Sequence, residues 1–263
     1  MMQVTTFILS LFAVIQLGTS FQPSIVSTSK TALSATYSQA ELKDKFQSLK
    51  EALPKDKNVV KAGGWYNLQQ LSGDPKGDLV RLIVDGLKDP EAKGKSTKAY
   101  DEALEALVTL LYAHGKGFEA DLVDGEWASV LARQGSKILQ KTVGEGQPKD
   151  WTDMDTYDID TMTFEGNRKV LRKGVVYSKK KYSPSSEAYS KTTDGKIVLR
   201  RIDCEMTKAT FKFWKLPTLS LPKKKGLYLD FWYLDKDIRI LKAYSGGLYI
   251  HFRPDFLSEQ LAN

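Results

Sequence analysis

The chain has 263 residues, of which 41% are hydrophobic and 27% are charged, and its formal net charge is +7. This length and composition are typical of a globular protein with one or two domains and a sizeable core. A single cysteine, Cys204, excludes an intrachain disulfide and a cysteine-built metal site. Two histidines, His114 and His251, leave little material for a zinc centre or a histidine-based triad, so we expect both to be structural or surface residues.

The N-terminal residues have the composition of targeting segments. Residues 1–20 contain no charge and have a short apolar run from Phe7 to Leu17, followed by the small residues Gly18 and Ser20. This pattern predicts a cleaved signal peptide. Residues 21–37 are rich in Ser and Thr and contain no acid, which is typical of a transit peptide. Together the two segments resemble the two-part presequence of plastid proteins in algae with secondary plastids. The alternative is secretion with a flexible polar linker.

Helical periodicity dominates residues 38–115. Ser38 and Glu41 form a capping box before an apolar stripe that Pro54 ends. Asp74 and Pro75 supply a cap and a first helical position for a second helix. A third and stronger helical pattern has its apolar stripe at Tyr100, Ala103, Leu104, Leu107 and Leu111. We therefore expect residues 38–115 to form a helical layer that packs on another part of the protein.

From about residue 127 onward the apolar period changes to two, which indicates β-strands. Candidate strands lie at about 127–133, 159–164, 169–177, 196–206, 210–213, 227–234 and 248–253. Short strands without long helices between them indicate an antiparallel sandwich or barrel. The predicted fold class is α+β, mainly β, with an antiparallel sandwich or barrel at residues 116–257 and a helical layer N-terminal to it.

Several predicted strands carry bulky side chains on both faces, as Trp232 does between Phe231 and Tyr233. This pattern fits a barrel that holds a ligand, and it equally fits a barrel whose outer face is covered by the helical layer. Alternation alone selects six candidates to face the lumen and bind a ligand, namely Phe211, Phe213, Leu227, Leu229, Phe231 and Tyr233. Each of the six is also a candidate for ordinary core packing.

Basic residues concentrate in one part of the chain. Between residues 166 and 225 there are 17 Lys and Arg against 4 Asp and Glu. Lysine runs at 179–181 and 223–225 flank predicted strands, where we expect loops. One interpretation is that these loops are simply solvated, and the other is that they hold the protein to an anionic membrane surface. Nucleic acid is the competing partner, which we rank lower because no nucleic-acid-binding motif is present in the sequence. The acidic stretch at residues 150–160 lacks the Gly and terminal Glu of a calcium loop, and we interpret it as a solvated connection that leads into a strand.

Two segments carry a family resemblance. The stretch "LVDGEWASVL" contains Gly125-x-Trp127 at the entry to the first predicted strand, and "YLDKDIRI" followed by "GGLYIHF" ends the barrel region. They resemble "LLDGRWELLYT" and "YLDEDLRISRGDGGSLFVL", which open and close the pattern of the plastid lipid-associated protein family, also called plastid fibrillins. The resemblance covers about residues 115–253. The matching positions of the second segment are Tyr233, Leu234, Asp235, Asp237, Arg239, Ile240 and Gly246.

The resemblance implies a lipocalin-like β-barrel in a plastid, either stromal or associated with thylakoids or plastoglobules. In such barrels a tryptophan plugs one end and a late arginine stacks on it, so Trp127 and Arg239 are the expected barrel-closing pair. Two alternatives remain for Arg239, namely a charged head group of a ligand or an ion pair with Asp235 or Asp237. The family also implies binding or organising of lipids, carotenoids or quinones, and it implies no catalytic set.

The leading hypothesis is a non-enzymatic binder of small hydrophobic molecules, without a metal, a cofactor or a nucleic-acid partner. A second hypothesis is a structural accessory subunit of a photosynthetic membrane complex. A third is an enzyme that acts on a lipid or a quinone. The sequence contains no nucleophile elbow, no phosphate-binding glycine loop and no general base with evident partners, which counts against the third. Cys204 is expected to be a buried structural thiol.

Overall fold

The structure is a computed structural model that describes residues 74–88, 98–134, 137–140, 153–170, 174–186, 188–191 and 195–263. All of them belong to one compact unit, Tyr37–Asn263. The predicted signal peptide at 1–20, the transit segment at 21–37 and the predicted helix that Pro54 ends lie outside the described residues.

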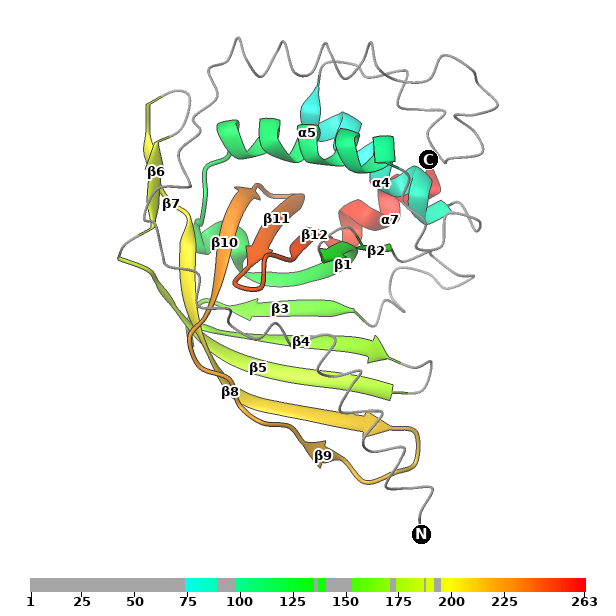
Figure 1. Cartoon of the computed structure of the whole chain (residues 1–263), viewed down its shortest axis with the longest axis vertical. Coiled ribbons are helices and arrows are strands. Elements are labelled where there is room, and N and C mark those ends of the chain that lie inside the picture. The colour runs from blue at the N-terminus through cyan, green and yellow to red at the C-terminus, as the bar shows by residue number, and fades with distance from the viewer. Residues whose placement is uncertain are drawn as a thin grey trace. The chain divides into compact units, whose positions relative to one another are not determined.

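Eight strands form a closed antiparallel barrel (Figure 1). Their order around the barrel is β10-β11-β12-β1-β3-β4-β5-β8, and the pairing of β8 with β10 closes it. The mainly β, antiparallel fold predicted from the alternating pattern is thereby confirmed, and of the two architectures left open by that pattern the structure has the barrel. The strands are β1 (Gly125–Gln134), β3 (Met154–Asp158), β4 (Thr163–Val170), β5 (Gly174–Pro184), β8 (Arg201–Phe213), β10 (Leu227–Leu234), β11 (Ile238–Ala243) and β12 (Leu248–Phe252).

Four short strands of the described part of the chain lie outside the barrel circuit. β2 (Lys137–Gln140) pairs with β1, and β9 (Leu219–Ser220) pairs with the C-terminal part of β8. β6 (Tyr189–Lys191) and β7 (Ile197–Leu199) form a separate two-stranded sheet. The part of β8 that pairs with β9 is therefore C-terminal to the part that pairs with β10.

Three of the helices in the described ranges pack on the outer face of the barrel (Figure 1): α4 (Pro75–Lys88), α5 (Lys98–His114) and α7 (Pro254–Ala262). They share an apolar cluster, here called the outer cluster, with the outward-facing side chains of β1, β11 and β12. Its fully buried members include Leu79, Ile83, Leu104, Leu107, Ile240, Ile250 and Leu257. Because side chains alternate along a strand, the outward-facing apolar residues of these strands hold the helices while their other face, which includes Arg239 and His251, lies inside the barrel. None of the described helices is long and apolar enough to cross a membrane.

A second apolar cluster, the inner cluster, fills part of the barrel. Its buried members are Val123, Trp127, Tyr157, Phe164, Tyr182, Ile202, Cys204, Leu227, Phe231, Leu234 and Leu241. Tyr157 and Phe164, opposite each other on β3 and β4, stack with ring centroids 4.6 Å apart. The short helix α6 (Ala120–Val123) adds Val123 to this cluster and so covers one end of the barrel.

Several predicted boundaries are wrong. The predicted strands at 159–164 and 169–177 both cross strand ends, because residues 159–162 form a turn, β4 ends at Val170 and β5 begins at Gly174. The acidic stretch interpreted as a solvated connection contains β3, since its central residues pair with both β1 and β4. The predicted barrel end at residue 257 falls inside α7, a helix that the sequence analysis does not anticipate.

Candidate functional site

Trp127 closes the end of the barrel that α6 covers. Its side chain is fully buried, and its indole Nε1–H donates a hydrogen bond of 2.7 Å to the carbonyl oxygen of Val123 in α6. Gly125 has a φ of +85°, a left-handed conformation that favours glycine and that turns the chain from α6 into β1. On one side of the indole lies Arg253, whose guanidinium carbon is 3.8 Å from the ring centroid and whose Nη2 donates to the carbonyl of Leu122.

Arg239 lies near the same indole inside the barrel. Its side chain is 0% exposed, and its guanidinium carbon is 5.0 Å from the Trp127 ring and 4.7 Å from the Tyr157 ring. Its Nη2 forms an ion pair of 2.7 Å with Oδ2 of Asp155. A charge at this depth requires both an opposite charge and a polarisable surface, and Asp155 and the two rings supply them. The acid that pairs with Arg239 is therefore Asp155, and not Asp235 or Asp237.

Asp155 is shared between Arg239 and a histidine. Nε2 of His251, which is opposite Arg239 in the β11–β12 register, is 3.2 Å from the same Oδ2 of Asp155. Burial by itself would raise the pKa of Asp155, but the contact with His251 and the charges of Arg239 and Arg168 hold that pKa well below its usual range. Gly166 lies opposite Asp155, and a Cβ there would come within 2.6 Å of Oδ1, so a larger residue at this position would displace the Asp155 carboxylate.

Burial and, second, the charge of Arg239 lower the pKa of His251 to about 3. At neutral pH the cluster thus consists of a cationic arginine, an anionic aspartate and a neutral histidine. A neutral imidazole with so low a pKa is a weak base, and burial raises the pKa of the nearby Cys204 thiol to about 12. The His251 imidazole is therefore poorly suited to act as a general base, and the Cys204 thiol is poorly suited to act as a nucleophile. No group of three or more His, Cys, Asp or Glu side chains in the described ranges is arranged to hold a metal ion.

We expect the free energy of unfolding to fall as the pH decreases from 6.5 towards 3, because His251 binds a proton in the unfolded chain and not in the folded one. Since the folded pKa is the lower one, this stability is complete above the unfolded pKa and is lost as the pH falls. The loss is at most about 1.4 kcal/mol per pH unit. Urea unfolding at a series of pH values should show a smaller slope for His251→Gln than for the wild type. His114→Gln is the control, and equal slopes in all three proteins would contradict a buried neutral His251.

Two further cations face the barrel interior. Lys180, opposite Phe164 in the β4–β5 register, has its Nζ 4.6 Å from the Phe164 ring centroid and 2.8 Å from Oγ of Ser178. Burial lowers the pKa of Lys180, and Asp155 partly opposes that shift. Arg168 shares the inward face of β4 with Phe164, and its guanidinium carbon is 5.0 Å from the Tyr249 ring centroid. Among the described residues no carboxylate forms an ion pair with Lys180 or Arg168, so the interior has an excess of positive charge.

The two ends of the interior differ in exposure. At the α6 end the inward-facing side chains, such as Trp127, Tyr157 and Phe231, are buried. Towards the other end they are partly exposed, as are Arg168, Val176 and Tyr249. Arg168 and Val176 are opposite each other in the β4–β5 register, and Val176 is opposite Phe211 in the β5–β8 register. Solvent therefore reaches the inward-facing side chains from the end opposite α6, and Arg168 lies there.

The six predicted lumen residues separate into three groups. Leu227, Leu229 and Phe231 pack in the inner cluster. Phe211 and Phe213 follow the inward parity of β8 towards the partly exposed end. Tyr233 does not face the lumen, because a bulge between Phe231 and Tyr233 shifts the β10–β11 register and places it against the outer cluster. Its hydroxyl donates a hydrogen bond of 2.9 Å to Asp235.

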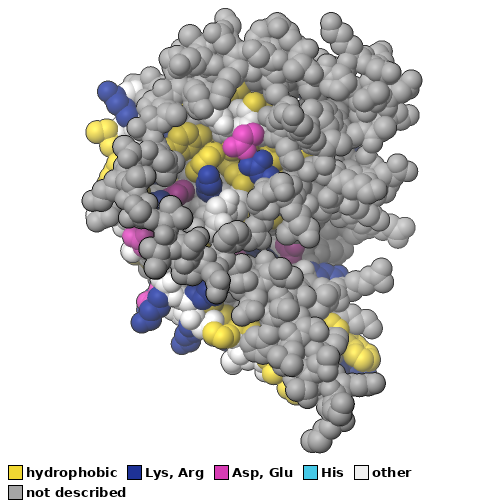
Figure 2. All heavy atoms as spheres, in the orientation of Figure 1, with side chains coloured by type: hydrophobic (Ala, Val, Ile, Leu, Met, Phe, Trp, Pro, Cys, Tyr) yellow, Lys and Arg dark blue, Asp and Glu magenta, His cyan; other side chains and the backbone are white. Residues whose placement is uncertain are grey.

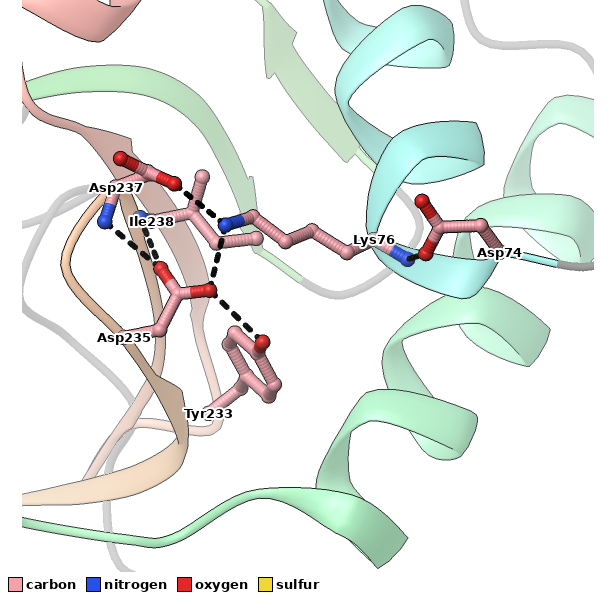
Figure 3. A network of polar contacts seen from close by, with 6 residues as sticks. All are labelled: Asp74, Lys76, Tyr233, Asp235, Asp237 and Ile238. Atoms are coloured by element: carbon pink, nitrogen blue, oxygen red, sulfur yellow. Dashed lines mark hydrogen bonds and ion pairs between the residues drawn. The ribbon is translucent and has the colours of Figure 1, made fainter.

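The turn between β10 and β11 is fixed to helix α4 (Figure 3). Nζ of Lys76 is 2.7 Å from a carboxylate oxygen of Asp235 and 2.7 Å from one of Asp237. Oδ1 of Asp235 also accepts hydrogen bonds from the backbone N–H groups of Asp237 and Ile238. The contacts of Lys76 with Asp235 and Asp237 fix the start of β11. They thereby position Arg239, which follows Ile238.

Four inward-facing residues of the described ranges are not predicted from the sequence as site residues, namely the charged Asp155, Arg168 and Lys180 and the neutral His251. Asp155 is one of several acids in a polar stretch, and Lys180 is one of three consecutive lysines. Composition therefore does not distinguish either residue from its exposed neighbours. The available indication is alternation, since Asp155 and Tyr157 share one strand face, as do Lys180 and Tyr182.

The fold and the interior define a closed antiparallel barrel with one covered end, a buried Arg–Asp pair and an excess of inward-facing cations. Comparisons of the chain with family models, with curated proteins and with solved structures found no match. The resemblance to the plastid lipid-associated proteins remains a prediction from the sequence segments alone.

Proposed function

We propose that this chain is a plastid protein whose lipocalin-like barrel binds small hydrophobic molecules and organises them at thylakoid or plastoglobule surfaces. In this proposal it is a divergent member of the plastid lipid-associated protein family and not an enzyme. The two-part targeting composition of residues 1–37 and the two family-like segments support the assignment. Helices α4 and α5 are in this view the described part of an N-terminal helical layer that supports the barrel.

The observation that carries the proposal is the inward-facing positive charge of Arg168, at the partly exposed end of the barrel, and of Lys180, which lies deeper, opposite Phe164. Asp155 is engaged by Arg239, which leaves Arg168 and Lys180 to attract a ligand group. Aromatic and aliphatic side chains lie around them, so the interior suits a molecule with an apolar body and an electron-rich head. A lipid with an acidic head fits best among the three ligand classes. A quinone offers carbonyl acceptors. A carotenoid hydrocarbon offers neither an acidic head nor a carbonyl.

The test is to purify the mature protein from its native plastid and to identify apolar molecules that co-purify, by mass spectrometry. We expect a stoichiometric lipid or quinone. A clean protein that elutes without any hydrophobic molecule contradicts the binding function. Import of a fusion between residues 1–37 and a fluorescent protein tests the location separately, and secretion of that fusion would refute the plastid assignment.

An accessory subunit of a photosynthetic membrane complex is the second candidate. The small sheet of β6 and β7 favours it, because Tyr189 is 58% and Ile197 is 76% exposed there. Exposed apolar side chains of this kind are typical of a protein contact. Native gel electrophoresis of solubilised membranes distinguishes the two candidates. Co-migration with a large complex, without any bound hydrophobic molecule, supports the accessory subunit.

A further inference from the structure

The β8–β9 hairpin presents three large apolar side chains to solvent. Trp214 is 59% exposed, Leu216 is 56% exposed and Leu219 is 48% exposed. All three lie at or beside the turn that joins β8 to β9, outside the barrel circuit. Figure 2, in the orientation of Figure 1, shows hydrophobic side chains together with Lys or Arg side chains at the surface near this hairpin. A concentration of exposed apolar side chains at one loop indicates an interaction site.

The turn holds the tryptophan outward in an unfavourable backbone conformation. Trp214 has a φ of +48°, which bulky residues rarely adopt, and the N–H of Leu216 donates a hydrogen bond of 2.9 Å to the carbonyl of Phe213. The backbone of Trp214 is therefore strained although its ring is largely exposed to solvent. Strain of this kind at an exposed aromatic residue is a feature of functional loops.

The charge around these side chains is of one sign. Residues 206–226 contain six lysines and no acid. Five of the six are exposed and Lys224 is partly buried. The run 223–225 lies alongside β8, since the N–H of Met206 bonds to the carbonyl of Lys224. Lys212 and Lys215 are within two residues of Trp214 in the chain, and the run 223–225 continues the basic surface further along β8.

We propose that the β8–β9 hairpin is a docking element that inserts Trp214, Leu216 and Leu219 into the headgroup region of an anionic lipid bilayer. A tryptophan ring is well suited to the interface between headgroups and acyl chains. Partial insertion of apolar side chains and attraction of the lysines by anionic lipid reinforce each other, and stable surface binding requires such a combination. The inference deepens the proposed function, on whose membrane location it rests.

Nucleic acid fits this surface less well. A nucleic acid would neutralise the lysines and stack on Trp214, but Leu216 and Leu219 have no flat face on which a base can stack. Residues 206–226 also contain no arginine, the side chain that forms bidentate hydrogen bonds with bases and phosphates. A bilayer buries all three apolar side chains at once.

The position of the hairpin relates docking to the barrel interior. β9 pairs with β8 at Thr210 and Phe211, and Phe211 is opposite Val176 at the partly exposed end of the barrel. A bilayer bound by the hairpin would therefore lie next to the end from which solvent reaches Arg168. In this arrangement a lipid passes between the membrane and the barrel interior over a short path.

The test is sedimentation of the purified mature chain with vesicles of phosphatidylcholine alone or mixed with phosphatidylglycerol. We expect the chain to bind the anionic vesicles. We expect the combined change of Trp214→Ser, Leu216→Ser and Leu219→Ser to weaken that binding at least about tenfold. The matched control is Tyr189→Ser with Ile197→Ser, which removes equally exposed apolar side chains from β6 and β7 and should bind like the wild type. Circular dichroism establishes that each variant is folded.

A second pair of variants tests the charges. Lys223→Gln, Lys224→Gln and Lys225→Gln should weaken binding to anionic vesicles, whereas Lys88→Gln, Lys116→Gln and Lys236→Gln remove the same charge elsewhere on the surface and should have little effect. Vesicle binding that survives the hairpin changes overturns the inference, as does binding of single-stranded RNA without binding of vesicles. A chain that fails to bind vesicles but retains a co-purified hydrophobic molecule overturns this inference alone and leaves the ligand-binding function standing.

Discussion

Replacing Arg239 with methionine is expected to lower the free energy of unfolding by about 3–5 kcal/mol. The change removes the positive partner of Asp155 and leaves its carboxylate buried without an opposite charge at hydrogen-bonding distance. It also removes the cation that lies 5.0 Å from the Trp127 ring and 4.7 Å from the Tyr157 ring at the covered end of the barrel. Methionine approximates the length of the arginine stem, so the loss reports the charge more than the volume. Urea unfolding followed by tryptophan fluorescence measures the effect.

Two variants separate this loss from the loss of an arginine as such. Arg201→Met removes an ion pair with Asp230 that is partly exposed to solvent, and it should cost less than about 1 kcal/mol. Arg239→Met combined with Asp155→Leu should recover part of the stability, because a buried pair replaced on both sides by apolar groups leaves no isolated charge. If Arg239→Met melted like the wild type while losing its ligand, Arg239 would be a binding residue and not a barrel-closing one.

The sequence contains most of the information about which residues form strands in the second half of the chain. Period-two alternation predicts β10 and β12 within a residue or two, and the polar triplet at 235–237 marks the turn before β11. These features are local, since alternation reflects one buried face and polar turns reflect backbone geometry. The same argument identifies the stripe of α5, whose members Leu104 and Leu107 are buried in the outer cluster.

The charged interior is not predictable in this way. Asp155 lies in a stretch whose acidity is typical of a loop, and only its pairing with β1 and β4 places the side chain inside the barrel. Its partners Arg239 and His251 come from strands more than 80 residues away in the chain, and no local pattern records that they meet. The prediction that Tyr233 faces the lumen is wrong for a related reason. A single bulge changes which face of the strand its side chain lies on, and the composition of the strand does not reveal the bulge.

Replacing both Arg168 and Lys180 with glutamine is expected to weaken the binding of a long-chain fatty acid roughly 100-fold or more, if the barrel binds an acidic amphiphile. Hydrogen bonds to charged groups contribute about 1.5–3 kcal/mol each, and this variant removes two cations that can supply them. Binding of the fatty alcohol of the same chain length should change little, because its apolar body meets the same inward-facing side chains. Competition with a fluorescent fatty acid measures both affinities in the purified mature chain.

The matched control is Lys169→Gln with Lys181→Gln. Each of these exposed residues is adjacent in the chain to one of the two inward-facing cations, and its side chain lies on the opposite face of the same strand. The control therefore removes the same net charge from β4 and β5 without altering the interior, and it should bind the fatty acid like the wild type. Equal losses in the two double variants would assign the effect to long-range surface charge. Equal affinity of the wild type for the acid and the alcohol would refute an acidic head group inside the barrel.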